Sequence, residues 1–82
     1  MNEKTVLILG AGLMQKPAFI AAKELGFKTA AVDGNPDAPC APLADFFKPV
    51  DLKDKDGILI FARELNKIQN ICAVFRSEEH TS

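Results

Sequence analysis

Several residue types that carry out chemistry or hold small folds together are rare in this chain of 82 residues. It has no tryptophan or tyrosine, and its one histidine, His80, lies close to the end, so nothing supports general-base catalysis by histidine. Its two cysteines, Cys40 and Cys72, form no CxxC pair, which argues against a zinc site and gives no disulfide framework. We therefore expect both to act as small apolar residues.

Excess charge and long apolar runs are also lacking. Ten basic and eleven acidic residues give a net charge of −1, which offers no attraction to nucleic acid or to an anionic membrane. The first apolar run, Val6–Leu9, ends at a glycine and is too short for a signal peptide or a membrane-spanning helix. We expect a cytoplasmic protein with neither a nucleic-acid nor a membrane partner.

The chain does contain alternating strand and helix patterns. Hydrophobic residues make up 48% and charged residues 26% of it, as in an ordinary globular domain. Four apolar segments predict strands, at Thr5–Leu9, Phe27–Val32, Phe46–Val50 and Ile71–Phe75. Two amphipathic helices are predicted between them, one starting near Met14 to Lys16 and ending at Leu25 before a Gly26 cap, the other capped by Asp54.

Each predicted helix has an apolar stripe at helical spacing. The stripes are Ala18, Phe19, Ala22 and Leu25 in the first helix, and Ile58, Phe61, Ala62 and Leu65 in the second. Right-handed crossovers give the strand order 3-2-1-4, and Pro49 demotes the third strand to an edge. The predicted fold class is α/β, a Rossmann-like open parallel sheet, with a ligand crevice between the carboxyl ends of the first and fourth strands.

A glycine turn follows the first strand at this crevice. Gly10 and Gly12 allow a sharp turn and a close ligand approach, and the helix after them offers N–H groups to a phosphate or another anion. Asp33 ends the second strand, where a nucleotide-binding unit has its acidic residue. The candidate substrate- or phosphate-binding residues are Gly10, Ala11, Gly12, Leu13, Met14, Gln15, Asp33 and Asn35.

Each candidate also has a purely structural interpretation. The two glycines fit close packing of strand and helix, and Gln15 fits a helix cap or a solvated side chain. Asp33 and Asn35 fit turn formation. The acidic cluster at Asp51, Asp54 and Asp56 fits a solvated helix start better than a metal site, so no metal-ligating and no catalytic residue is predicted.

Three segments together resemble a known family. They are GAGLMQKPAFIAAKELG, AVDGNPDAP and PLADFFKPVDLKDKDGI. The stretch from Lys4 to Phe75 resembles the N-terminal (pre-ATP-grasp) domain of ATP-grasp enzymes, such as carboxylate–amine ligases and the large subunit of carbamoyl phosphate synthase. Gln15, at the third glycine of the dinucleotide fingerprint, and the following Lys16-Pro17 separate the chain from that fingerprint.

The resemblance implies an ATP-dependent ligase that forms an acyl phosphate from a carboxylate and passes the acyl group to an amine. ATP and Mg²⁺ would be held mainly by later domains outside this chain, and this domain would face a small carboxylate or phosphorylated substrate. The implied partners are the missing C-terminal ATP-grasp domains of the same chain and, in a homo-oligomer, further copies. We expect the 82 residues alone to be inactive.

Two other functions stay open. Gly10, Gly12 and Asp33 also fit the NAD(P)- or flavin-binding Rossmann half of an oxidoreductase, although Gln15 opposes it. A free-standing binding module is the third hypothesis.

The end of the chain, Arg76–Ser82, fits nothing before it and resembles the translation of a sequencing-library adapter. We therefore assign residues 1–75 to the N-terminal domain fragment and 76–82 to a non-native tail; a genuine polar terminus is the alternative. With the fourth strand at one edge, exposed apolar surface and aggregation are expected.

Overall fold

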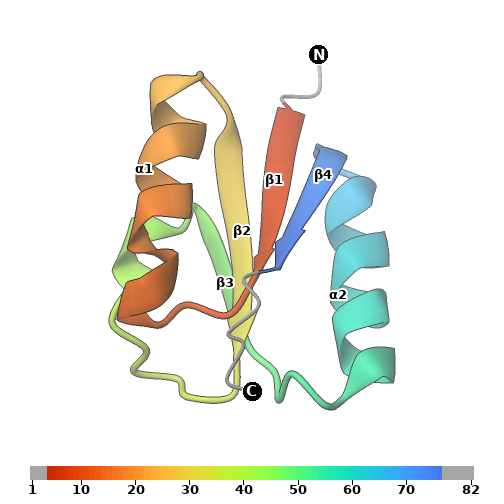
Figure 1. Cartoon of the computed structure of the whole chain (residues 1–82). Coiled ribbons are helices and arrows are strands. Elements are labelled where there is room, and N and C mark those ends of the chain that lie inside the picture. The colour runs from red at the N-terminus through yellow and green to blue at the C-terminus, as the bar shows by residue number, and fades with distance from the viewer. Residues whose placement is uncertain (1–3, 77–82) are drawn as a thin grey trace.

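A four-stranded parallel sheet with a helix on each face forms the domain (Figure 1). The computed structural model describes residues 4–76. The strands lie in the order β3-β2-β1-β4, which confirms the predicted fold class and topology. Their bounds are β1 (Lys4–Leu9), β2 (Lys28–Asp33), β3 (Phe46–Pro49) and β4 (Asn70–Arg76). The helices are α1 (Lys16–Glu24) and α2 (Lys55–Asn66), with 3-10 turns η1 (Leu13–Gln15) and η2 (Ala41–Leu43).

Helix α1 begins and ends as its sequence predicts. A proline stands in its first turn, where the missing N–H is tolerated. At the other end Gly26 has φ +86, and the Phe27 N–H donates to the Ala22 carbonyl at 2.9 Å, which closes the helix in a Schellman motif.

One residue of the first predicted stripe is misplaced. Phe19 and Ala22 are buried, but Leu25 is 71% exposed. The stripe prediction for Leu25 is wrong because Leu25 lies one residue past the end of the helix at Glu24, where neither core layer reaches it.

Helix α2 covers the opposite face less completely. Asp54 is its cap, as predicted, and accepts a hydrogen bond from the Gly57 N–H at 3.0 Å. Leu65 is buried against Leu7, whereas Phe61 and Ala62 are only partly buried. The helix therefore packs most tightly through its last turn.

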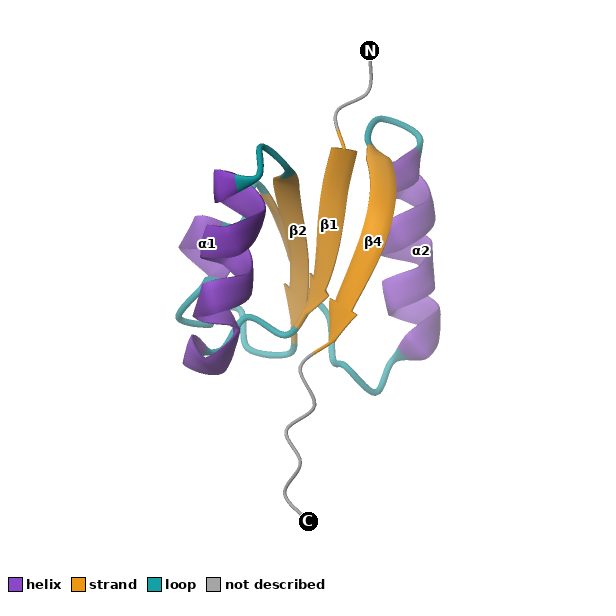
Figure 2. Ribbon diagram, turned by 45° about the horizontal axis from the view of Figure 1, so that its top comes forward, coloured by secondary structure: helices purple, strands orange, loops and turns teal. Residues whose placement is uncertain are grey.

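The core consists of two apolar layers, one on each side of β1 and β2. On the α1 side Phe19 packs with Ile8 and Ala31, and on the α2 side Leu65 packs with Leu7 and Ala30. The first layer also contains Cys40, in agreement with its predicted apolar role. Both layers leave β4 largely uncovered (Figure 2).

The outer strands end the sheet as the sequence predicts. β3 pairs only with β2, so Pro49 removes no hydrogen bond from the sheet interior. Arg76 is the last residue of β4; the rest of the predicted non-native tail, including His80, lies outside the described residues. No helix within residues 4–76 is long and apolar enough to cross a membrane.

Candidate functional site

A cleft of about 860 Å³ opens at the carboxyl ends of β1 and β4. This is the point where the order of the parallel strands reverses, and ligands of open α/β sheets bind at such points. One wall is the glycine turn after β1, and the other is made by α2 and β4. The structure thus has a hollow where the sequence predicts the ligand crevice.

The glycine turn is held by hydrogen bonds of its own backbone. Gly10 has φ +108, and its N–H donates to the Val32 carbonyl at 2.8 Å. The Gln15 N–H donates to the Gly12 carbonyl at 3.0 Å. These two N–H groups are engaged inside the protein, whereas within residues 4–76 no hydrogen bond engages the N–H groups of Gly12, Leu13 and Met14.

Asp33 ties the end of β2 to the glycine turn. Its Oδ2 accepts a hydrogen bond from the Ala11 N–H at 2.8 Å, and its Oδ1 accepts from the Asn35 N–H at 2.9 Å. Ala11 is completely buried, so this carboxylate satisfies a donor that water does not reach. Asp33 lines the cleft, yet each of its oxygens already holds a backbone N–H.

Cys40 fixes the same turn from the other side. Its N–H donates to the Ala11 carbonyl at 2.8 Å, and its thiol donates to the Gly12 carbonyl at 3.3 Å. The side chain is only 1% exposed. The sequence analysis assigned Cys40 an apolar role and missed these contacts, because no local pattern indicates that residues 28 positions apart meet.

The Gln15 carboxamide lies over both glycines. A Cβ placed on Gly10 would be 3.4 Å from Gln15 Nε2, and one placed on Gly12 would be 3.6 Å from Gln15 Oε1. Gln15 is partly buried and lines the cleft. A Cβ at either glycine would thus be in ordinary van der Waals contact with this polar group.

The other candidates separate into two groups. Met14 lines the cleft with the two glycines, Gln15 and Asp33. Ala11, Leu13 and Asn35 lie outside the lining. The Asn35 side chain instead accepts a hydrogen bond from the Asp37 N–H at 2.9 Å, which fits its turn-forming interpretation.

The far wall brings in residues that the sequence analysis did not select. Lys55 and Ile58 come from the first turns of α2, and Val74 and Arg76 come from the end of β4. Lys55 is the first residue of α2, between Asp54 and Asp56 of the predicted solvated helix start, and in the structure it lines the cleft. The wall is mainly apolar with two cations.

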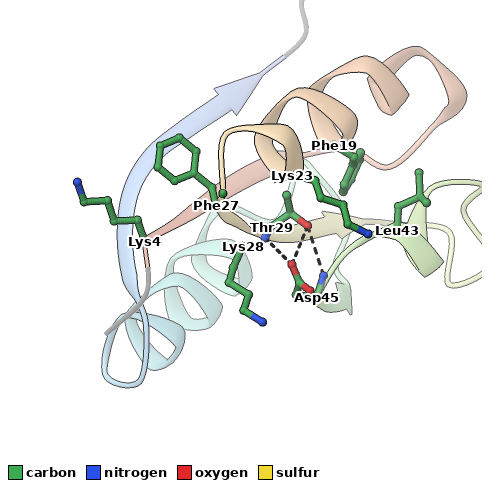
Figure 3. A pocket seen from close by; sticks show the side chains of 9 residues that line it. Lys4, Phe19, Lys23, Phe27, Lys28, Thr29, Leu43 and Asp45 are labelled. Carbon is green, nitrogen blue, oxygen red and sulfur yellow. Dashed lines mark hydrogen bonds between the residues drawn. The ribbon is translucent and has the colours of Figure 1, made fainter. Parts of the chain in front are cut away.

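A second, smaller hollow of about 430 Å³ lies at the opposite end of the sheet (Figure 3). Asp45 there accepts hydrogen bonds from the N–H and hydroxyl of Thr29 at 2.8 and 3.4 Å. The side chains of Lys4, Lys23 and Lys28 point in different directions in Figure 3, so they do not converge on one ligand. Within residues 4–76 no group of three His, Cys, Asp or Glu side chains could hold a metal ion.

Comparison with known proteins identifies relatives of this chain, although no protein-family model matches it. Over 65 residues it is 32% identical to the formate-dependent phosphoribosylglycinamide formyltransferase of Prochlorococcus marinus strain MIT 9301. Over 64 residues it is 34% identical to the N5-carboxyaminoimidazole ribonucleotide synthase of Bacillus subtilis strain 168. The homologues of this chain are ATP-grasp enzymes.

The matches cover most of this chain but only a small part of each relative. The alignments cover 79% and 78% of this chain but only 17% and 16% of the two relatives. A solved structure, the ADP complex of an N5-carboxyaminoimidazole ribonucleotide synthetase, matches with a TM-score of 0.72 and 29% identity. That match covers 100% of this chain and 20% of the other. The chain therefore corresponds to about one sixth to one fifth of the enzymes it resembles.

Proposed function

We propose that the chain is the N-terminal, substrate-side domain of an ATP-dependent carboxylate–amine ligase that works through an acyl phosphate. The observation that carries the proposal is the match of the whole chain, at a TM-score of 0.72, to a synthetase solved with ADP. Sequence similarity to two ATP-grasp enzymes supports the same assignment independently.

In this proposal the cleft receives the acid. The hydrogen-bonded turn at Gly10–Gln15 forms one rigid wall, and Lys55 on α2 provides a positive charge across from it. ATP and Mg²⁺ would bind mainly to domains outside these 82 residues, as the resemblance to ATP-grasp enzymes implies. When bound, they supply the phosphoryl group and the charge that stabilises its transfer.

The contacts of Asp33 weigh against the oxidoreductase alternative. In a dinucleotide-binding unit the acid after the second strand accepts hydrogen bonds from a ribose. Here Asp33 accepts from the N–H groups of Ala11 and Asn35 instead, at 2.8 and 2.9 Å. The role of this carboxylate is to fix the turn, which favours a positioning residue over a ribose ligand.

A chimera tests the function. The matching segment of the Bacillus subtilis synthase is replaced by residues 4–75 of this chain, and ADP formation is measured with the synthase's own substrates. We expect substrate-dependent ADP formation by the chimera and none by the 82-residue chain alone. A folded chimera that forms no ADP, beside an active unmodified synthase, would contradict the proposal.

Sequencing of the gene that encodes this chain tests the proposed domain division. Long-read sequencing without adapters, through the codons for Ala73 to Ser82, is expected to show the reading frame continuing past Phe75 with different codons. A confirmed stop after Ser82 would instead favour the free-standing binding module.

A further inference from the structure

We propose that the solvent-facing side of α1 is a self-association surface, on which a second copy of this chain packs antiparallel about a two-fold axis at Ile20. A shallow groove of about 490 Å³, the outer groove, runs along this side of the helix. It shares no lining residue with the cleft, so it is separate from the site of the proposed function. The residues that line it are Leu13, Lys16, Pro17, Ile20, Ala21 and Glu24.

Helix α1 has apolar residues on two faces, whereas a surface helix normally has one. Phe19, on the inner face, packs in the core. In the outer groove Leu13 is 68% and Ile20 45% exposed, and Pro17 between them is exposed as well. Adjacent exposed apolar residues mark interaction surfaces. The outer face of α1 is therefore apolar without contributing to the core of the domain.

The shape of the outer groove suits another helix of the same kind. Its residues form two ridges with a residue at every fourth position, Lys16-Ile20-Glu24 and Leu13-Pro17-Ala21. When such ridges of one helix pack into the grooves of another, the result is the commonest helix packing in globular proteins. Ala21 is small, so a second helix can approach closely at the middle of the groove.

The charges at the two ends of the groove identify a second copy as the occupant. Lys16 is the first residue of α1 and Glu24 the last, each four positions from Ile20. A copy related by a two-fold axis at Ile20 presents these charges in reverse order, so each Lys16 lies beside the Glu24 of the other copy. A parallel copy would place like charges together. Within residues 4–76 neither side chain has an ion pair or hydrogen bond that would compete.

The order of these two charges is not explained by the stability of α1 itself. A helix dipole favours an acidic residue at the amino end and a basic residue at the carboxyl end. Lys16 and Glu24 have the opposite order. In the antiparallel pair this disadvantage is offset, because Glu24 at the carboxyl end of one helix lies beside Lys16 at the amino end of the other.

The pair is expected to be weak. One face of a nine-residue helix is small, and stable interfaces bury at least about 1,200 Å² in total. We therefore expect a dissociation constant between about 1 µM and 1 mM. The net charge of −1 does not oppose association of two copies.

A charge-reversal experiment tests the pairing. Sedimentation velocity of the unchanged 82-residue chain, over concentrations that span these constants, should show a monomer–dimer equilibrium. Lys16→Glu and Glu24→Lys should each weaken the dimer about tenfold, because each change places like charges together twice. Mixing the two variants should restore dimers to the level of the unchanged chain, since a mixed pair has opposite charges at both ends. Both changes agree with the helix dipole, so the free energy of unfolding should not fall.

Two further variants serve as controls. Lys23→Glu changes the net charge as Lys16→Glu does, on the same helix but outside the groove, and should leave the dimer unchanged. Ile20→Lys places two cations at the two-fold axis and should give only monomers. Circular dichroism confirms that each variant is folded.

Three results would overturn the inference. They are a monomeric unchanged chain, equal dimerisation of all variants, and single-charge variants that stay monomeric when mixed. Equal dimerisation would indicate association through β4, which the charges at positions 16 and 24 do not affect. The experiment involves no turnover, so its failure is distinct from failure of the chimera.

Discussion

Strands β2 and β4 both pair in parallel with β1, yet one is the most buried strand of the sheet and the other the most exposed. Ala30, Ala31 and Val32 of β2 are inaccessible to solvent. Val74 and Phe75 of β4 are 60% and 42% exposed. The difference comes from the helices, because both cover β2 and β1 while only α2 lies behind β4 (Figure 2). Pairing alone does not bury a strand.

The candidate cleft lies between these two regions. Its glycine wall is fixed by Val32 and Asp33 at the end of β2 and by Cys40 in the loop that follows. Its other wall consists of partly buried and exposed residues of α2 and β4. The cleft therefore has one wall held by hydrogen bonds and one wall of more exposed, mainly apolar residues.

The largest predicted effect comes from the buried region. Ile8→Ala removes a fully buried side chain between Phe19 and Ala31, and should lower the free energy of unfolding by about 2–5 kcal/mol. Val74→Ala, on the neighbouring exposed strand, should cost less than about 1 kcal/mol because little buried surface is lost. Urea unfolding followed by circular dichroism measures both. Equal losses would mean that β4 is as well packed as β1.

A smaller effect is predicted where β2 meets the glycine turn. Asp33→Ala leaves the buried Ala11 N–H without its acceptor and should destabilise the domain by about 1–3 kcal/mol. The Ala11 amide should also exchange with solvent faster. Asp37→Ala, in the same loop but exposed, is the control, with an expected change within about 0.5 kcal/mol. Slow exchange of Ala11 in Asp33→Ala would show that another group holds the turn.

The sequence predicts the fold well because each element carries its own local signal. Gly26, Pro49 and Asp54 mark a helix end, an edge strand and a helix start, and the structure bears out all three. The prediction for Leu25 was wrong because the residue lies past the end of the helix, where neither core layer reaches it.

The site was harder to predict because its contacts are long-range. The stretch around Gly10–Gln15 is visible as a motif, but the bonds from Asp33 and Cys40 that fix it span 22 and 28 positions. Lys55 lines the cleft because of where α2 packs against the sheet, and no local sequence pattern indicates that position.

For α2, the helix behind β4, we predict a change of intermediate size in the free energy of unfolding. Asp54→Ala removes the cap of α2 and should cost about 0.5–2 kcal/mol, since the Gly57 N–H loses its acceptor. Amides of β4 should lose protection from exchange more than those of β2, because α2 is the helix that covers β4. Asp56→Ala, in the same turn without a capping bond, should cost less. Equal loss of protection in both strands would contradict the expectation that α2 protects β4 more than β2.

We predict that substitutions in β4 itself have the smallest effect on stability but a measurable effect on self-association. Val74 lines the cleft on the α2 side and Phe75 pairs in register with Ile8, so replacing both with threonine reduces apolar surface on the exposed strand. Unfolding free energy should change by less than about 1 kcal/mol, while sedimentation velocity should show less self-association. Unchanged association would point instead to the outer edge of β4, where the backbone N–H and C=O groups of an edge strand can pair with another chain.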